Sequence, residues 1–348
     1  AAVDASGLGA GDIAIWGRHL SLTGGSQIEA STLGAQPGGT FTVNVTDAVE
    51  VIGVSVDGQF HSLLGAVVYP GAKGTGGELS IDTKRLIVRD GGSAVITGTF
   101  GEGQSGTLMV NATESVELVG RLSNGESSGL FAVVYPGAKG AGSELRVDTG
   151  QLIIRDGAVL GTATFGEGAS GNLIVNATES VELVGRSSNG LQASGLFTSV
   201  QPGARGAGGE LNIDTKRLIV RDGAVLSAGT LGEGLSGNLR VNATESVEVT
   251  GTGRDGFPSI LTARTGTAAN GGTLTIKTER LVVEDEAQIT VSSSSSGQAG
   301  TLKLQAESIL LNNQASLQAN TTGGGGKIVL TTPLLLLRRG GNITTNTQ

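Results

Sequence analysis

The feature that most constrains the fold of this chain is an internal repeat. One segment occurs three times with a constant spacing of 66 residues, at Gly77–Gly91, Ser143–Gly157 and Gly209–Gly223. A weaker fourth copy starts at Leu274, and a degenerate first copy starts at Ile13. Self-similarity at a long, fixed period is typical of a solenoid, in which each repeat packs only on its neighbours.

The 66-residue unit is itself double. A second segment alternates with the first, at Phe41–Ile52, Leu108–Val119, Leu173–Val184 and Leu239–Thr250. Half-repeats therefore start at Ile13, Phe41, Leu79, Leu108, Leu145, Leu173, Leu211, Leu239, Leu274 and Leu302, and an incomplete one starts at Ile328. Apolar residues alternate with a period of two, which predicts strands. We expect three short strands per half-repeat, for example Leu79–Ile81, Leu86–Val88 and Val95–Thr99.

Composition supports an all-β chain. Sixty glycines would interrupt any helix every few residues at a free-energy cost, whereas they suit frequent turns. The apolar fraction of 38% is too high for a disordered linker. Three strands per coil, stacked on identical coils, predict a parallel β-helix of about ten coils with a 66-residue double-coil repeat. Crossovers between parallel strands are almost always right-handed, so we expect a right-handed helix.

We expect one continuous β-helix segment over residues 1–348 rather than separate domains. The predicted repeats are 11–74, 75–140, 141–206, 207–270 and 271–332, with 333–348 as an incomplete final coil. The strand pattern is already under way at the first residue and still continues at the last. We therefore expect this chain to be a segment of a longer β-helix.

Equivalent residues of successive coils should form columns, and three columns can be traced. The inward positions of the third strand in alternate coils are predicted to be Ile28, Ile96, Leu160, Leu226 and Ile289. Three residues after the coil starts stand Asn44, Asp82, Asn111, Asp148, Asn176, Asp214, Asn242, Lys277 and Gln305, which we expect in turns. Six residues before the starts, charges alternate as Lys73, Glu102, Lys139, Glu167, Arg205 and Glu233. Stacked amides and opposite charges would both help to fix the register.

The sequence offers little for catalysis. Four outward glutamates of the second strand, Glu50, Glu117, Glu182 and Glu248, alternate with isoleucines and lie two coils apart, roughly 9.6 Å. A carboxylate pair needs one acid made different from the other, and a regular repeat makes them alike. We therefore predict a non-enzymatic chain without a cofactor. The net charge of −8 argues against nucleic acid as a partner.

Other short motifs have structural interpretations. His19 and His61 are the only histidines and there is no cysteine, so no metal site is predicted. The Arg-Asp-Gly triplets that end the second strand of alternate coils are ordinary turn chemistry. Three Asn-Ala-Thr triplets match the glycosylation pattern, but their asparagines belong to the column described above, which favours a structural role.

The copies diverge in one place, the long loop between the second and third strands of alternate coils. We name these ridge loop 1 (Gly53–Ser62), ridge loop 2 (Gly120–Ser128), ridge loop 3 (Gly185–Ser194) and ridge loop 4 (Gly251–Ser259). Insertions on one face of a repeat array often form its binding face. The candidate contact residues are Phe60, Arg121, Asn124, Arg186, Asn189, Arg254 and Phe257. The alternative is that these are solvated, variable loops.

Nearly the whole chain resembles the repeat region of filamentous-haemagglutinin-like exoproteins of two-partner secretion systems, in particular those of cyanobacteria. The resemblance lies in GDIAI at 11–15, LNIDTKRLIVRDGA at 211–224, GEG at 101–103 and NATESVELVG at 176–185. It implies a right-handed β-helix, export through an outer-membrane secretion partner, a secreted or cell-surface location, and adhesion. The amino-terminal secretion domain of that family does not occur in this sequence.

The sequence thus predicts a structural and adhesive rod that presents loops for surface or cell contact. Two alternatives remain. One is an extracellular fibre that assembles end to end, since unpaired strand edges favour such contacts. The other is a β-helix that binds or cleaves polysaccharide, such as a surface glycan, through the glutamates or the ridge loops.

Overall fold

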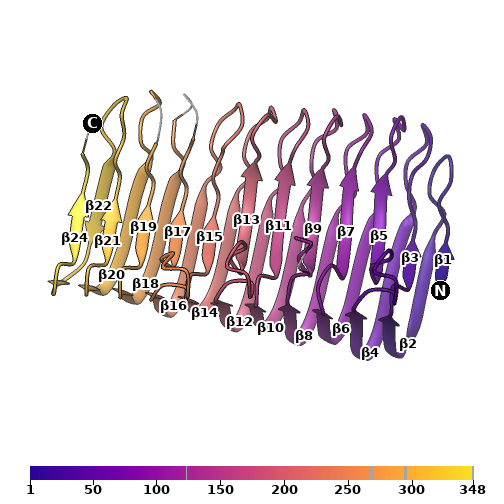
Figure 1. The fold of residues 1–348 in the computed structure, drawn as a ribbon, viewed down its shortest axis with the longest axis horizontal. Helices are drawn as coiled ribbons and strands as arrows, with labels where there is room; N and C mark the ends of the chain where they lie inside the picture. Colours follow the sequence, from indigo (N-terminus) through magenta and orange to yellow (C-terminus); the bar gives the residue numbers. More distant parts are fainter. Residues whose placement is uncertain (123, 267–269, 294–295, 347–348) are drawn as a thin grey trace.

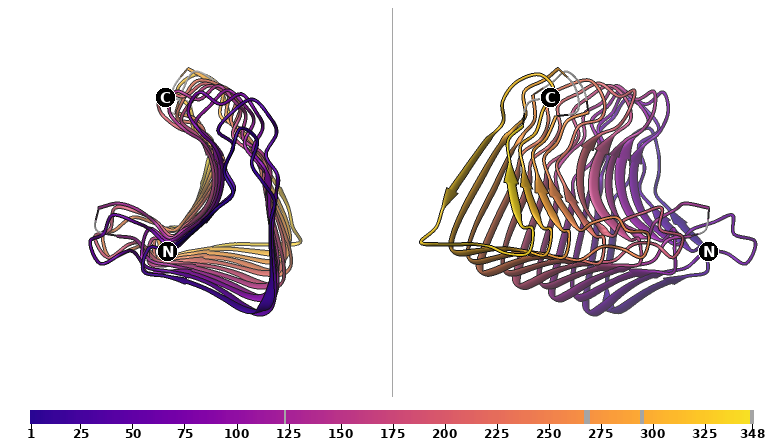
Figure 2. Two further views of the ribbon diagram at one scale, coloured as in Figure 1. Left: turned by 90° about the vertical axis from the view of Figure 1, so that its right-hand side faces the viewer. Right: turned by 60° about the vertical axis from the view of Figure 1, so that its left-hand side comes forward.

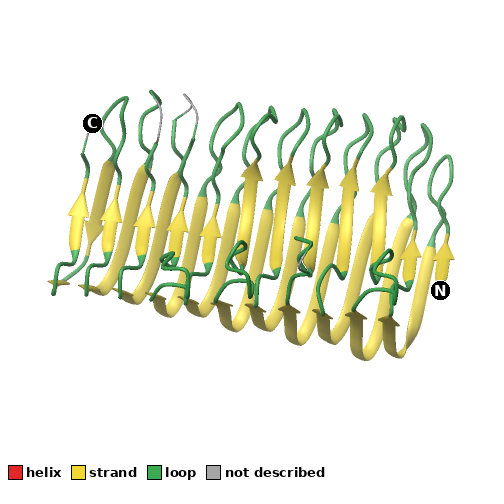
Figure 3. Ribbon diagram, in the orientation of Figure 1, coloured by secondary structure: helices red, strands yellow, loops and turns green. Residues whose placement is uncertain are grey.

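The computed structural model describes residues 1–122, 124–266, 270–293 and 296–346, and all of its regular elements are strands (Figures 1 and 3). The described residues contain no helix of the length and apolarity needed to cross a bilayer. Two kinds of strand alternate along the chain, and each kind forms its own parallel sheet of 12 strands. The chain is therefore an all-β parallel β-helix, as the repeat predicts.

The first sheet consists of the long strands and the two short final elements. They are β2 (Ile13–Thr23), β4 (Thr40–Ile52), β6 (Glu78–Arg89), β8 (Leu108–Val119), β10 (Leu145–Arg155), β12 (Leu173–Val184), β14 (Leu211–Arg221), β16 (Leu239–Thr250), β18 (Thr273–Glu284), β20 (Thr301–Asn312), β22 (Lys327–Thr331) and β23 (Leu334–Leu337). They pair in chain order, and both β22 and β23 pair with β20.

The second sheet, called the short-strand sheet below, also pairs in chain order. Its strands are β1 (Ala2–Asp4), β3 (Gln27–Glu29), β5 (Leu63–Val68), β7 (Ala94–Thr99), β9 (Gly129–Val134), β11 (Val159–Thr164), β13 (Gly195–Val200), β15 (Val225–Ser227), β17 (Ile260–Thr262), β19 (Gln288–Thr290), β21 (Ser316–Gln318) and β24 (Asn342–Thr344). Viewed from the N-terminal side, each coil runs up a short strand and down a long one, clockwise and away from the viewer, so the helix is right-handed (Figure 2).

The first two strands expected in each half-repeat are one continuous strand in the structure. In β6, the expected strands Leu79–Ile81 and Leu86–Val88 both lie within Glu78–Arg89. The long strand bends near its middle and so supplies two walls of a three-sided cross-section, while the short strand supplies the third (Figure 2). Pairing continues through the bend because the register shifts there, between Thr83 and Arg85 of β6. Such a bulge turns the chain without ending the ladder.

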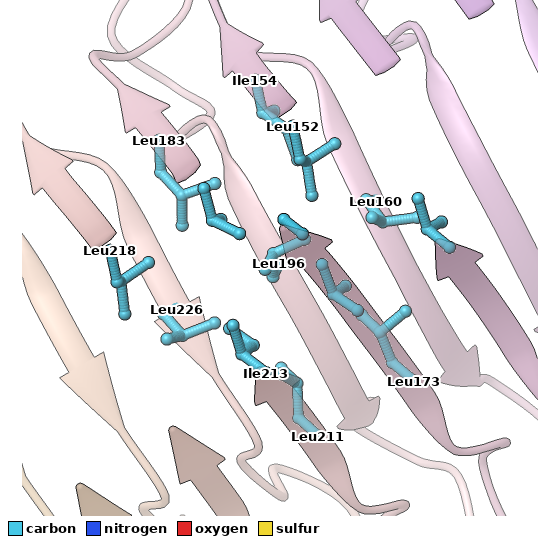
Figure 4. Packing of buried hydrophobic residues seen from close by; sticks show 14 of the residues in the cluster. Leu152, Ile154, Leu160, Leu173, Leu183, Leu196, Leu211, Ile213, Leu218 and Leu226 are labelled. Atoms are coloured by element: carbon cyan, nitrogen blue, oxygen red, sulfur yellow. The ribbon is translucent and has the colours of Figure 1, made fainter. Parts of the chain in front are cut away.

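Strand alternation sends one apolar row inwards along every wall. Leu and Val at the inward positions of β10 and β12 are fully buried and form one continuous cluster with their equivalents in other coils (Figure 4). The predicted inward column of the third strand is correct for Ile28, Leu160, Leu226 and Ile289 but wrong for Ile96. Val95 is the fully buried residue, and Ile96 points outwards.

Two further columns have the predicted register, although the first lies inside the long strands rather than in turns. Asn111 donates a hydrogen bond to Asp82 at 3.1 Å, and Asn242 donates one to Asp214 at 2.9 Å, from one coil to the preceding one. The glycosylation-pattern asparagines thus have structural partners. In the charge column, ion pairs join Lys73 to Glu102 and Arg205 to Glu233. These exposed pairs contribute at most about 1 kcal/mol each.

Glycines fill the turns that lead from the short strands to the long ones because successive coils approach backbone to backbone there. A Cβ on Gly171 would overlap the carbonyl oxygen of Ser143 in the preceding coil. The same overlap recurs with Gly209 against Gly171 and with Gly237 against Gly209. The high glycine content therefore reflects columns of close approach and not only turn geometry.

Replacing Gly171 by alanine should destabilise the rod, because the new methyl group forces neighbouring coils apart. We expect Gly171→Ala to lose about 1–3 kcal/mol in the free energy of unfolding. Gly17→Ala is the control, since a Cβ there meets no atom within 4 Å, and it should stay within about 0.5 kcal/mol of the wild type. Chemical denaturation measures both variants, and equal losses would contradict the close-approach argument.

Candidate functional site

The four ridge loops protrude at one corner of the cross-section, where the long strands lead into the short ones (Figures 2 and 3). All four close in the same way at their base. The amide of the final serine donates to the carbonyl of the first glycine, for example from Ser194 to Gly185 at 3.0 Å and from Ser259 to Gly251 at 2.9 Å. The predicted ridge on one side of the rod is therefore present.

Three of the four closing serines also join their ridge loops to the tight turns of the preceding coils. The buried hydroxyl of Ser194 accepts a hydrogen bond from the Gly157 amide at 2.9 Å, and Ser259 does the same for Gly223 at 3.0 Å. Asp156 and Gly157 both have positive φ, 59° and 83°, as the turn chemistry of the Arg-Asp-Gly triplets requires. Ser62 accepts from Gly25 in the same way, whereas the buried hydroxyl of Ser128 has no hydrogen-bond partner among the described residues. The closing serines of ridge loops 1, 3 and 4 are thus each held by a turn from the preceding coil.

Contacts between ridge loops tie them in pairs. His61 of ridge loop 1 lies 3.0 Å from the carboxylate of Glu126 in ridge loop 2. Arg186 of ridge loop 3 lies 2.9 Å from Asp255 in ridge loop 4, and its guanidinium sits over the Phe257 ring at 4.8 Å. The Arg186 side chain also donates to the Gly190 carbonyl and is only 14% exposed. It therefore acts as a hub that orders two loops.

The predicted contact residues divide into structural and exposed groups. Arg121 donates to the Gly125 carbonyl at 2.7 Å in the manner of Arg186. Asn124 and Asn189 form the turns at the loop tips, because their side-chain oxygens accept the amide hydrogens two residues on. Five candidates remain accessible: Asn124 and Asn189, although they hold the turns, together with Arg254, Phe60 (53% exposed) and Phe257 (56% exposed).

Removing the Arg186 hub should loosen ridge loop 4. Arg186→Ala deletes the ion pair with Asp255 and the stacking on Phe257, so we expect the opening free energy of residues 251–259 to fall by about 1.5–3 kcal/mol. Amide hydrogen exchange of that segment measures the change. Arg254→Ala removes an exposed arginine from the same loop and should leave exchange unaltered. Similar exchange in the two variants would show that Arg186 does not order the loop.

The outward glutamates have the predicted register, in which Glu117 pairs with Ile87 and Ile153 of the adjacent coils. Three of them have basic partners in adjacent coils, Glu50 with His19, Glu117 with Arg155 and Glu248 with Arg280. Glu182 instead accepts from the Ser180 hydroxyl. An isoleucine separates each glutamate from the next along the column. No two of them share a site in which one could act as acid and the other as base.

In the described ranges, no group of three His, Asp or Glu residues is placed to hold a metal ion.

A long groove runs over the outer face of the short-strand sheet, beside the ridge. The outer face of this sheet is concave, and the ridge loops lie along one border of it (Figure 2). The groove has a volume of about 810 Å³ and extends from β9 to β21. Ridge loops 2, 3 and 4 supply its wall through Ser127, Gln192 and Pro258. The ridge and the groove therefore form one continuous surface, which we call the outer groove.

Aromatic residues concentrate on this face. The chain has ten aromatic residues, seven Phe, two Tyr and one Trp, and six of them project outwards from the short-strand sheet or directly after it: Tyr69, Phe100, Phe131, Tyr135, Phe165 and Phe197. Phe100 and Tyr135 stack with ring centroids 3.8 Å apart. A Cβ on Gly129 would meet the Phe131 ring at 2.8 Å, and one on Gly195 would meet the Phe197 ring at 3.1 Å. The Phe131 and Phe197 rings thus lie over glycines of their own strands, and both line the groove.

The outer groove was not predicted from the sequence. The sequence prediction covers the outward glutamates of the second strand and the inward column of the third strand, and the outward aromatic residues of the third strand belong to neither. Its signal is the spacing of the aromatic residues, since Phe131 and Phe197 are 66 residues apart and recur with the double coil. Apolar residues that form a contiguous exposed patch are an indication of a binding surface.

The two tyrosines border the same face, and burial raises the pKa of both. Burial raises the pKa of Tyr135 to about 12, and burial together with the nearby Glu29 carboxylate raises that of Tyr69. The Tyr135 side chain is partly buried, and its ionised form loses more favourable solvation there than its neutral form does. The phenol is thus held neutral well above its ordinary range.

Alkaline titration should reveal the raised pKa of Tyr135. We expect two tyrosinate absorbance transitions, with the upper one near pH 12 absent from Tyr135→Phe. The stability that Tyr135 contributes through this pKa is complete below its ordinary pKa of 10.0 and is lost as the pH rises towards about 12. Unfolding of the wild type relative to Tyr135→Phe across that window tests the sign. A single transition at the ordinary value in the folded protein would contradict the burial of Tyr135.

Comparisons with protein-family models, with curated proteins and with solved structures returned no match. The functional argument therefore depends on the ridge loops and the outer groove themselves.

Proposed function

We propose that the chain is a non-enzymatic structural and adhesive rod of a secreted or cell-surface protein, exported with the help of an outer-membrane partner. The observation that supports an adhesive role is the ordered ridge. Four loops of different sequence share one base geometry, lie on one side of the rod and are tied together in pairs across coils. Solvated, variable loops would not need a largely buried arginine hub.

The distribution of polar groups favours binding over catalysis. Each outward glutamate has its own partner, and the described His, Asp and Glu residues form no metal-binding group. The ridge loops instead carry exposed apolar side chains, among them Phe60, Leu191 and Phe257. Solvent-exposed apolar surface of this kind is typical of a contact site.

The test is a rod without its ridge. The tight turn of β10–β11 joins the same two walls with Asp156, Gly157 and Ala158 only. Replacing residues 53–62, 120–128, 185–194 and 251–259 each by Asp-Gly-Ala should preserve the β-sheet circular dichroism spectrum. Beads coated with this variant should bind cells of the source organism much less than beads coated with the wild type. Undiminished binding by a folded ridge-less rod would contradict the proposal.

A second arm of the test concerns location. Antibodies raised against the ridge loops should label intact cells of the source organism or precipitate the chain from the medium. Labelling only after cell lysis would contradict a secreted or surface location.

A further inference from the structure

The dimensions of the outer groove suit a single extended chain. From β9 to β21 there are six strand steps, which span roughly 29 Å at about 4.8 Å each. Spread over those steps, the groove volume of about 810 Å³ leaves about 135 Å³ per step. This is on the scale of one sugar ring and is too narrow for a helix or a folded domain to enter.

The spacing of the aromatic rings along the groove is a second dimension that a ligand has to match. Phe131, Gly161 and Phe197 are direct neighbours in the outward row, on β9, β11 and β13. The aromatic rings are thus two strand steps apart, roughly 9.6 Å, with a glycine between them. That distance is close to the disaccharide repeat of an extended β-1,4-linked polysaccharide, in which successive rings turn opposite faces to the same side.

The chemistry of the lining fits a sugar chain. Phe131, Phe165 and Phe197 offer flat apolar faces of the kind that pack against the C–H face of a pyranose ring. Groups that hydrogen-bond to hydroxyls surround them and include Gln192, Gln201, Gln288, Gln318, Ser199 and Thr290. The Thr262 hydroxyl on the groove floor is buried and has no hydrogen-bond partner among the described residues. An apolar floor with a few polar groups at its margins is the usual composition of a ligand site.

Charge and backbone pairing argue against other occupants. Among the residues that the structure describes, Arg186 and Arg264 are the ionisable ones that line the groove, and none of these residues places a carboxylate there although the chain carries a net charge of −8. The floor is the face of a sheet whose strands already pair on both sides, so it offers no free edge to which a peptide strand could be added.

We propose that the outer groove binds one extended chain of β-1,4-linked pyranose sugars, which lies along the rod axis and stacks on Phe131 and Phe197. The inference rests on the adhesive role proposed above and gives it a ligand class. The shared chemistry is the alternating β-1,4-linked ring. A neutral glucan and an acidic mannuronan both supply it, and Arg264 would add an ion pair for the acidic chain.

Affinity electrophoresis with soluble polysaccharides tests the proposal. Hydroxyethylcellulose is the neutral probe, mannuronate-rich alginate is the acidic probe, and dextran, whose linkage is different, is the control. We expect the wild-type chain to be retarded by at least one of the first two probes and not by dextran. Failure to bind either β-1,4-linked probe, or equal retardation by dextran, would overturn the proposal. A loss of alginate binding alone in Arg264→Ala would identify the acidic chain as the preferred source.

Variants locate the site. The double variant Phe131→Ala and Phe197→Ala should bind the retained probe at least about tenfold more weakly, because both stacking faces are lost. Trp16→Ala removes a 74% exposed aromatic side chain from the other sheet and should bind as the wild type does. Thermal denaturation checks that both variants fold. Unchanged affinity in the folded double variant would overturn the assignment of the groove.

Two further results separate this inference from the adhesive role. Concentration-dependent dimers that disappear in the double variant, without binding of either β-1,4-linked probe, would make the groove an interface between copies of this chain and overturn the glycan proposal. Cell binding that needs the ridge but persists in the double variant would leave the adhesive role intact and remove the groove from it. If the chain binds a β-1,4-linked probe through the groove but adheres to no cell, the glycan proposal stands and the adhesive role is contradicted.

Discussion

The parallel hydrogen-bond ladder between successive coils is the interaction on which the rest of the structure depends. In a parallel ladder each residue lies beside the equivalent residue of the next coil, at about 4.8 Å. A residue type at a given position of one coil is therefore either repeated at the equivalent position of the neighbouring coils or has to pack against a different residue there. Leucine stacks on leucine inside, asparagine bonds to aspartate outside, and glycine stacks on glycine where backbones approach. The register, rather than any single contact, ties the composition of the chain to its shape.

The same constraint turns small local differences into extended surfaces. A three-residue turn and a ten-residue loop can join the same two walls, so loops inserted in alternate coils line up at one corner without disturbing the core. Buried serines and the Arg186 hub then hold those loops in place. On the adjoining wall, the alternation of Phe131, Gly161 and Phe197 gives a flat strip with a two-coil period. Ridge and groove are thus two results of one register.

Much of this could be predicted because period and alternation are local properties of a sequence. The architecture, the column of asparagine and aspartate and the position of the ridge loops all follow from spacing. Ile96 was misplaced because Val95 and Ile96 are both apolar, so alternation could not decide between them, and the turn before them is one residue longer than in β10–β11. The bend inside the long strands interrupts the alternation of the sequence and so resembles two strand ends. The aromatic strip was missed because its members are about 30 residues or more apart in sequence and become neighbours only through the ladder.

The two-coil period has a consequence for how such a rod could change. Adding or removing one 66-residue unit would displace everything beyond it by roughly 9.6 Å along the axis and bring every column back into phase. The lateral chemistry would stay the same while the reach of the rod changed. Recombination between its near-identical copies could therefore alter the rod's length, and with it the number of sugar-sized steps along its side, without redesigning any residue.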